Sequence, residues 1–128
     1  MTGEHELSSV RVSRRRGDQV AEGEVRVPPA ESDDAAAVAA ALAWETLGRR
    51  YLKAGDPDDA VAAAQAGLDE LGDPPPDPDV VDDTELKLYA AEERVRQGHT
   101  RDGASNMLDI LRVRAELHAR ALGAELAR

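Results

Sequence analysis

Histidines and aspartates are the residues of this chain whose types could bind a metal ion or transfer a proton. The three histidines, His5, His99 and His118, lie far apart, and none stands in an HExxH or comparable ligand spacing. Five aspartates lie between residues 73 and 83, but the prolines among them keep the chain extended, and the glycine and terminal glutamate of an EF-hand loop are missing. The sequence therefore predicts no metal site, no cofactor and no catalytic residue, and we expect the protein not to be an enzyme.

Other signatures of catalysis and of export are also missing from the sequence. There is no phosphate-binding loop, no GxGxxG and no GxSxG. Cysteine is absent, which excludes disulfides and thiolate chemistry. No apolar stretch reaches the roughly 18 residues of a membrane span, and the first residues contain no apolar signal core. We expect a cytoplasmic protein that does not contact a membrane.

The charges of the chain are unevenly distributed. The formal net charge is -10, and residues 31–83 contain fourteen acidic and three basic residues. The basic cluster Arg14, Arg15 and Arg16 could contact a nucleic acid or another polyanion. Three arginines without interleaved aromatic residues are a weak signal for nucleic acid, and the segment that carries them could instead fold back onto the acidic body. Because that body repels phosphates, the charges argue against a nucleic-acid partner.

Residues 1–30 form an N-terminal arm without helical periodicity. Two pairs of valines in this arm alternate with polar residues, which predicts either a short hairpin or a disordered segment. Pro28 and Pro29 close the arm, and the pattern then changes to that of a helix. Ser32 or Asp33 can cap a first helix over residues 33–54.

Residues 31–128 have the pattern of a helical domain. Gly55 ends the first predicted helix, and a second helix follows to about residue 71. A stiff connector rich in proline and aspartate is predicted over residues 72–83. A third helix, capped by Asp82 or Asp83, ends at Gly98, and a fourth, capped by Thr100, extends almost to the last residue. The predicted fold class is all-α, with about four helices in antiparallel hairpins.

One stretch carries a family signature. Trp44, Leu47, Gly48, Tyr51 and Ala60 fall at the spacing W-x2-L-G-x2-Y, with a small residue nine positions later. This spacing resembles a tetratricopeptide repeat over about residues 41–74, and residues 84–115 resemble a degenerate second repeat. We interpret the five residues as structural, because the small ones allow two antiparallel helices to approach and the aromatic ones fill the gaps toward neighbouring helices.

The resemblance implies a non-enzymatic adaptor or scaffold that binds a protein or peptide. In the family, the first helix of each pair forms the concave binding surface. The residues expected on this surface are Glu45, Arg49, Lys53, Glu85, Leu88, Glu92 and Arg96. The sequence does not identify the partner that this surface would bind.

The fourth predicted helix gives an alternative hypothesis. Its apolar surface is wider than one partner helix would bury, and two repeats are fewer than the roughly three that a stable stack needs. The chain could then be a dimeric accessory or regulatory subunit, which assembles through this helix and uses the basic arm for nucleic acid or another polyanion. The assembly residues on this hypothesis are Met107, Ile110, Leu117 and Ala121.

Overall fold

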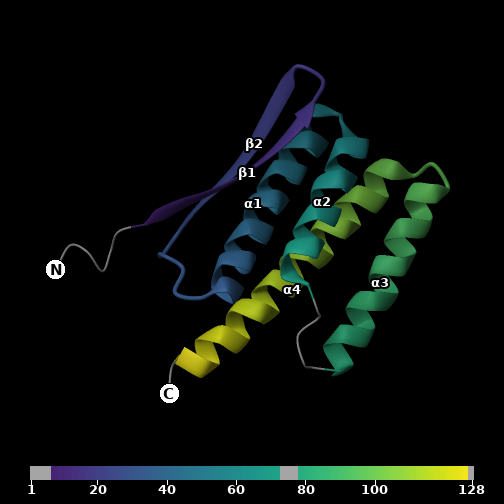
Figure 1. The fold of residues 1–128 in the computed structure, drawn as a ribbon. Helices are drawn as coiled ribbons and strands as arrows, with labels where there is room; N and C mark the ends of the chain where they lie inside the picture. The colour runs from purple at the N-terminus through teal and green to yellow at the C-terminus, as the bar shows by residue number, and fades with distance from the viewer. Residues whose placement is uncertain (1–6, 73–77, 127–128) are drawn as a thin grey trace.

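Two strands and four helices make up the described part of the chain (Figure 1). The computed structural model describes the backbone of residues 7–72 and 78–126, and the side chains of residues 7–72 and 83–123. The elements are, in chain order, β1 (Ser8–Arg16), β2 (Gln19–Val27), α1 (Asp33–Ala54), α2 (Pro57–Leu71), α3 (Pro78–Arg96) and α4 (Thr100–Leu126). The predicted all-α class is wrong, because β1 and β2 form an ordered antiparallel hairpin next to the helices.

The hairpin forms because its sequence combines alternation with a suitable turn. Arg16 pairs with Gln19, so only Gly17 and Asp18 connect the strands. Gly17 has a φ of 60°, which a type II′ hairpin turn requires at its first central residue. Burial alternates along both strands, with Val10, Val12, Val25 and Val27 on the partly buried face, whereas Val20 lies exposed on the other face with most of the polar residues. Of the two alternatives for the N-terminal arm, the structure has the hairpin.

A glycine allows the hairpin to lie directly against α1. A Cβ atom built on Gly23 of β2 would lie 2.3 Å from the carbonyl oxygen of Ala43 and 2.8 Å from Cβ of Leu47. Glycine inside a strand often marks such a close approach of another backbone. The absence of a side chain at this position therefore determines how closely the sheet packs on the helix.

The first two helices have the bounds that their capping residues predict. Ser32 accepts a hydrogen bond of 3.1 Å from the backbone N–H of Ala35 at the start of α1. Gly55 ends α1 with a left-handed φ of 84° and donates its N–H to the last turn. Pro57 then occupies the first turn of α2. The prediction for these two helices is confirmed.

Helix α3 begins earlier than the sequence predicted. It starts at Pro78 rather than after Asp82 or Asp83, so the end of the predicted connector over residues 72–83 is helical. Proline is compatible with the first turn of a helix, where its missing N–H has no intrahelical acceptor. Residues 73–77 of that connector lie outside the described residues.

Helix α4 is the centre of the packing. It contacts α1, α2 and α3, whereas α3 packs on α4 alone among the described elements (Figure 1). A Cβ atom on Gly48 of α1 would lie 2.5 Å from Leu108, and one on Gly67 of α2 would lie 2.5 Å from Leu111. The leucines of α4 thus occupy space that glycines leave on the first two helices. In a core with so few aromatic residues, this fit of leucine against glycine provides close packing.

The five residues interpreted as structural occupy two kinds of environment. Leu47, Gly48 and Ala60 are buried, whereas Trp44 and Tyr51 are only half-buried. Gly48 makes room mainly for Leu108 of α4, and a Cβ atom there would also lie 3.4 Å from Ala63 of α2. The small residue therefore serves the packing of α4 as well as the α1–α2 pair named in the prediction.

Candidate functional site

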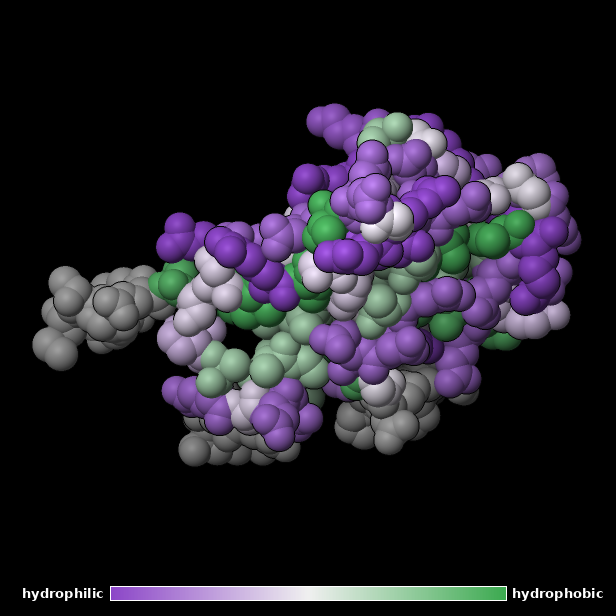
Figure 2. Space-filling model, turned by 45° about the horizontal axis from the view of Figure 1, so that its top comes forward, coloured by the Kyte–Doolittle hydropathy of each residue, from purple (hydrophilic) through white to green (hydrophobic). Residues whose placement is uncertain are grey.

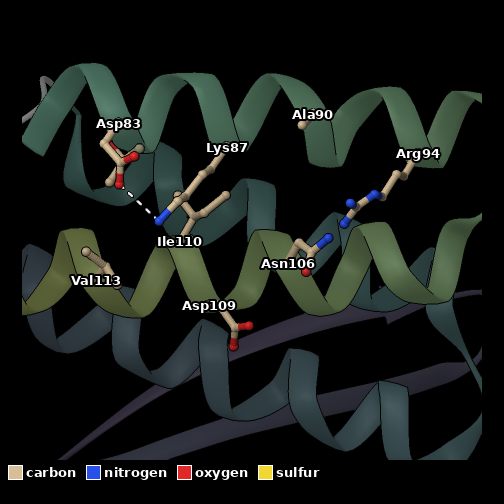
Figure 3. A pocket seen from close by; sticks show the side chains of 9 residues that line it. Asp83, Lys87, Ala90, Arg94, Asn106, Asp109, Ile110 and Val113 are labelled. Atoms are coloured by element: carbon tan, nitrogen blue, oxygen red, sulfur yellow. Dashed lines mark ion pairs between the residues drawn. The ribbon is translucent and has the colours of Figure 1, made fainter.

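A groove of about 370 Å³ lies between α3 and α4 (Figure 3). Helix α3 lines it with Asp83, Thr84, Lys87, Ala90 and Arg94, and α4 lines it with Asn106, Asp109, Ile110 and Val113. These residues recur every three or four positions on each helix, so that each helix presents one face to the groove. The groove has an apolar floor and charged side chains along its length.

The charged side chains are arranged differently at the two ends of the groove. At one end, Lys87 pairs with Asp83 over 3.0 Å, one helical turn apart on α3 (Figure 3). Toward the other end, Arg94 from α3 and Asn106 from α4 lie on facing helices, while the side chain of Asp109 points away from α3. The groove thus offers hydrogen-bond donors and acceptors at both ends and apolar contact between them.

The outer surface of α3 carries two large exposed apolar side chains among charged ones. Leu86 is 72% exposed and Tyr89 is 62% exposed, and their spacing places them on one face. Val113, on α4 in the wall of the groove, is 44% exposed. Figure 2 shows a face of the molecule that is mostly hydrophilic, with hydrophobic residues in separate groups. Exposed aromatic and aliphatic side chains beside a groove are typical of a protein-interaction surface.

A network of ion pairs joins α1 to α4 next to this groove. The buried carboxylate of Glu45 accepts hydrogen bonds from Arg49 over 2.8 Å and from Arg112 over 3.2 Å. Arg49 also donates to Asp109 over 2.9 Å, and Arg112 donates to Glu116 over 2.8 Å. Partial burial lowers the pKa of Arg49, but its bonds to the two carboxylates outweigh this and raise the pKa above the ordinary arginine value. Both arginines remain charged and hold the two helices together.

The predicted concave surface is divided into two separate groups. Glu45, Arg49 and Lys53 lie on α1, and the other four residues lie on α3, but these two helices do not contact each other because α4 lies between them. Glu45 is buried within the ion-pair network, so its carboxylate is already paired. Lys53 is exposed and forms no ion pair with the described residues. The α1 group is thus mainly a packing interface with α4.

The four predicted residues on α3 differ among themselves. Leu88 is partly buried against the core, whereas Glu85 is exposed and Glu92 is half-buried. Arg96 is exposed, donates from its Nε to Glu93 over 2.9 Å, and lies 6.0 Å from the ring centre of Tyr89. The α3 residues therefore stand beside the exposed apolar face of this helix, although they do not line the groove.

The residues predicted to mediate assembly are mostly covered within the chain itself. Met107 is 1% exposed and Ile110 is 5% exposed, because the face of α4 on which they lie is buried in the core. Leu117 is half-buried and Ala121 is exposed. The excess apolar surface of the fourth helix is thus covered largely by three helices of its own chain, and Met107 and Ile110 are not available to a second copy.

Two arginines of the basic cluster are paired within the chain. Arg14 and Arg16 both donate to the buried carboxylate of Asp59 in the first turn of α2, with Arg16 at 2.8 Å. Arg14 also lies 5.9 Å from the ring centre of Tyr51 on α1. These pairs fasten the tip of the hairpin to both helices, and Arg15 is the member of the cluster that forms no ion pair with the described residues.

The groove and the Asp59 contact were not found from the sequence. The alternation of the hairpin places Arg14 and Arg16 on one face, which could have suggested a common acidic partner. Nothing in the sequence pointed to Asp59 among its many acidic residues. Lys87, Arg94 and Asn106 have no motif, and only the packing of α3 on α4 brings them together.

Metal binding and membrane insertion find no support in the described part of the chain. No group of three or more histidine or acidic side chains there could hold a metal ion. No helix among the described residues is long and apolar enough to cross a bilayer. Nε2 of His118 is buried and has no hydrogen-bond partner among the described residues. Of the aspartates considered in the connector, only Asp83 has a described side chain, and it pairs with Lys87.

Comparisons with known proteins give no relative for this chain. No family model, no curated protein and no solved structure matches it. The resemblance to a tetratricopeptide repeat therefore stays a prediction, supported by the spacing of its residues alone.

Proposed function

We propose that this protein is a non-enzymatic interaction module that binds a segment of another protein along the α3–α4 groove. The observation that carries the proposal is that α3 packs on α4 alone among the described elements, that the groove runs along this pair, and that Leu86 and Tyr89 are exposed on the outer face of α3. Large apolar side chains exposed near a groove mark a candidate interaction surface. A partner segment in the groove would give α3 a second packing partner.

The shape and polarity of the groove suit a peptide better than a small metabolite. It is open, and its apolar floor of Ala90 and Ile110, with Val113 in the wall, lies between polar ends. An amphipathic helix or extended segment could place apolar side chains on this floor and its charges against Lys87 or Arg94. The Asp83–Lys87 ion pair at one end and the cation Arg94 toward the other make the two ends different, which would fix the direction in which the segment binds.

A photo-crosslinking experiment tests this proposal in the cell of origin. A photoreactive phenylalanine analogue is placed at Val113 in the groove wall, and a control is placed at Asp69, which is exposed on α2. The proposal expects discrete crosslinked proteins from position 113 and not from position 69. Ala90→Glu, which places a carboxylate on the groove floor, should abolish these crosslinks, whereas Ala36→Glu, at an exposed alanine of α1, should leave them unchanged.

The outcomes separate a binding groove from an ordinary surface. Crosslinks from both positions in equal yield would contradict a specific groove. Crosslinks from position 113 that persist in the Ala90→Glu variant would also contradict a specific groove. Salt-sensitive DNA binding that is lost on replacing Arg14, Arg15 and Arg16 would instead favour the accessory-subunit hypothesis.

A further inference from the structure

The outer edge of β1 presents a row of backbone groups that the hairpin does not use. Because the two-residue turn makes Arg16 and Gln19 a hydrogen-bonded pair, every second residue along β1 points its N–H and C=O away from β2. The residues with outward backbone groups are Ser9, Arg11, Ser13 and Arg15. The strand is nine residues long and contains neither proline nor a bulge, two of the devices that protect an edge; its charged residues are arginines, whose side chains leave the outward backbone groups uncovered.

The edge of β2 is different, because α1 covers part of it. The same alternation makes the carbonyl of Glu22 point outward from β2, and Arg50 of α1 donates to this oxygen over 2.6 Å. Nothing comparable in the described part of the chain reaches the outward backbone groups of β1. The open edge of the sheet is therefore the β1 edge.

Helix α2 lies on the side of α1 toward which the β1 edge faces. Arg50 and Tyr51 are neighbours on α1; Arg50 reaches β2, whereas Tyr51 lies near Arg14 of β1. Arg14 and Arg16 then continue from β1 to Asp59 on α2. A third strand beside β1 would therefore lie over α2.

Small apolar side chains form the surface of α2 beneath this position. Asp59, Ala62 and Ala66 are spaced at i, i+3 and i+7, so the two alanines continue along the face from which Asp59 reaches the hairpin. Both alanines are half-buried. Helices pack about 8–10 Å apart and strands about 4.8 Å apart, so two strands cover one helix and leave the second uncovered. The α1–α2 layer thus has room for one or two more strands.

A second copy of this chain does not fit the same space. Pairing β1 with its symmetry mate would extend the sheet, but the copy would bring its own α1 beneath its own hairpin. That position is occupied by α2 of the first chain. The occupant must therefore be a strand without a helix packed on its inner face.

The chemistry of the edge specifies the side chains of that strand. Residues facing α2 must be small or apolar to lie on Ala62 and Ala66, and the alternate residues face solvent beside Arg11 and Arg15. Arg11 is paired with Glu24 over 2.8 Å, whereas Arg15 is exposed and forms no ion pair with the described residues. Acidic residues at the alternate positions would complement these arginines.

We infer that the β1 edge binds an extended segment of another protein, in which small apolar residues alternate with acidic ones. The segment adds a third strand to the hairpin and lies over α2. Main-chain hydrogen bonds to the four outward residues of β1 provide affinity, and the alanine stripe and Arg15 provide selectivity. This surface is separate from the α3–α4 groove and does not depend on it.

A peptide with the sequence of β2, QVAEGEVRV, is a suitable probe because it has this alternation. Titrating the labelled peptide into the full chain should give saturable binding by fluorescence anisotropy. Amide hydrogen exchange should slow at Ser9, Arg11, Ser13 and Arg15 when the peptide is bound. A peptide in which both glutamates are replaced by lysine should bind about tenfold or more weakly, since it faces like charges.

Two protein variants test the site from its two sides. Ser13→Pro removes one outward N–H, which β2 does not use, and proline is tolerated at such an edge position. Ala66→Glu places a charge beneath the added strand without altering the hairpin, and Ala36→Glu is its matched control. We expect the first two variants to weaken binding about tenfold or more and the control to leave it unchanged.

Several results would overturn the inference. The peptide could replace β2 instead of adding to β1; binding would then be unaffected by Ser13→Pro, and the amides of β2 would lose protection. Equal binding by Ala66→Glu and Ala36→Glu would place the peptide elsewhere. A failure to saturate at millimolar peptide, or dimerisation of the chain that Ser13→Pro abolishes, would also contradict it. Ala90→Glu in the groove should leave peptide binding unchanged, and weaker binding by this variant would contradict the inference.

Discussion

Gly23→Ala is the substitution that most directly tests how the hairpin is attached to the helices. The new Cβ atom would lie 2.3 Å from the carbonyl oxygen of Ala43 and 2.8 Å from Cβ of Leu47. Both atoms are fixed to the backbone of α1, so neither can rotate away. The sheet must therefore move outward from the helix, which also loosens the other contacts between β2 and α1.

The size of the effect follows from two opposing contributions. Overfilling a packed interface costs about 1–3 kcal/mol. Replacing glycine with alanine restores up to about 1 kcal/mol by restricting the unfolded chain. We expect a net loss of about 1–2 kcal/mol in the free energy of unfolding, and a fall in the melting temperature of about 4–8 °C.

Two other glycines are matched controls for the same substitution. At Gly48, the nearest atom to a new Cβ is Cδ2 of Leu108 at 2.5 Å, the end of a flexible side chain, so we expect a smaller loss, of about 1 kcal/mol. At Gly123 on α4, no atom lies within 4 Å of the new Cβ. Alanine there should be neutral or stabilise the chain by up to about 1 kcal/mol, because of its higher helix propensity.

Chemical denaturation gives the required free energies. Circular dichroism follows the helices, and the fluorescence of Trp44, the single tryptophan of the chain, follows the α1–α2 region. The order of stability should be Gly123→Ala, then Gly48→Ala, then Gly23→Ala. If Gly23→Ala is as stable as the unaltered chain and its β2 amides remain protected from exchange, the close packing of sheet on helix described above is wrong.

Three further predictions concern the ion pairs. Asp59→Ala should lower the free energy of unfolding by about 1–2 kcal/mol, because it leaves Arg14 and Arg16 without their carboxylate. Amide hydrogen exchange should become faster in β1 but not in α4. Glu45→Ala should also lower the free energy of unfolding by about 1–2 kcal/mol in urea denaturation, less than the loss of a fully buried pair, since Arg49 and Arg112 are half-exposed and each keeps another carboxylate. Hydrogen bonds from Arg11 and, to a smaller extent, from Ser9 lower the pKa of Glu24 below its ordinary value of 4.5. The ionised Glu24 therefore stabilises the folded protein at a pH above 4.5, and this stabilisation is lost as the pH falls through the lower pKa of Glu24 in the folded protein. The stability difference between the unaltered chain and Glu24→Gln should therefore disappear in acid, and a difference that grows in acid would contradict the assignment.

Local signals in the sequence predicted the helices well. The capping serine before α1, Gly55 between the first two helices and Pro57 after it each act within one turn of the backbone, so their effect can be read from neighbouring residues. Pro78 was predicted to lie in the connector, because proline inside a helix breaks it. Proline in the first turn of a helix is compatible with it, and Pro78 has this position in α3.

Features that depend on distant residues could not be predicted in the same way. The hairpin was ambiguous because two valines per strand bury little surface; its order depends on Asp59, more than forty residues away along the chain. The apolar width of α4 was recognised, and a second copy was expected to cover it only under the alternative hypothesis; in the structure α3 covers part of it. The groove has no sequence signal because its lining comes from the spacing of two helices.

The central position of α4 has a consequence for folding during synthesis. This helix is made after the hairpin and the other three helices, yet its leucines fill the space beside Gly48 and Gly67. Until α4 leaves the ribosome, α1 and α2 expose an apolar surface lined by small residues, and α3 has no described helix on which to pack. The core of the described elements is therefore completed only after α4 has been made, and truncations within α4 should be far more harmful than removal of the hairpin.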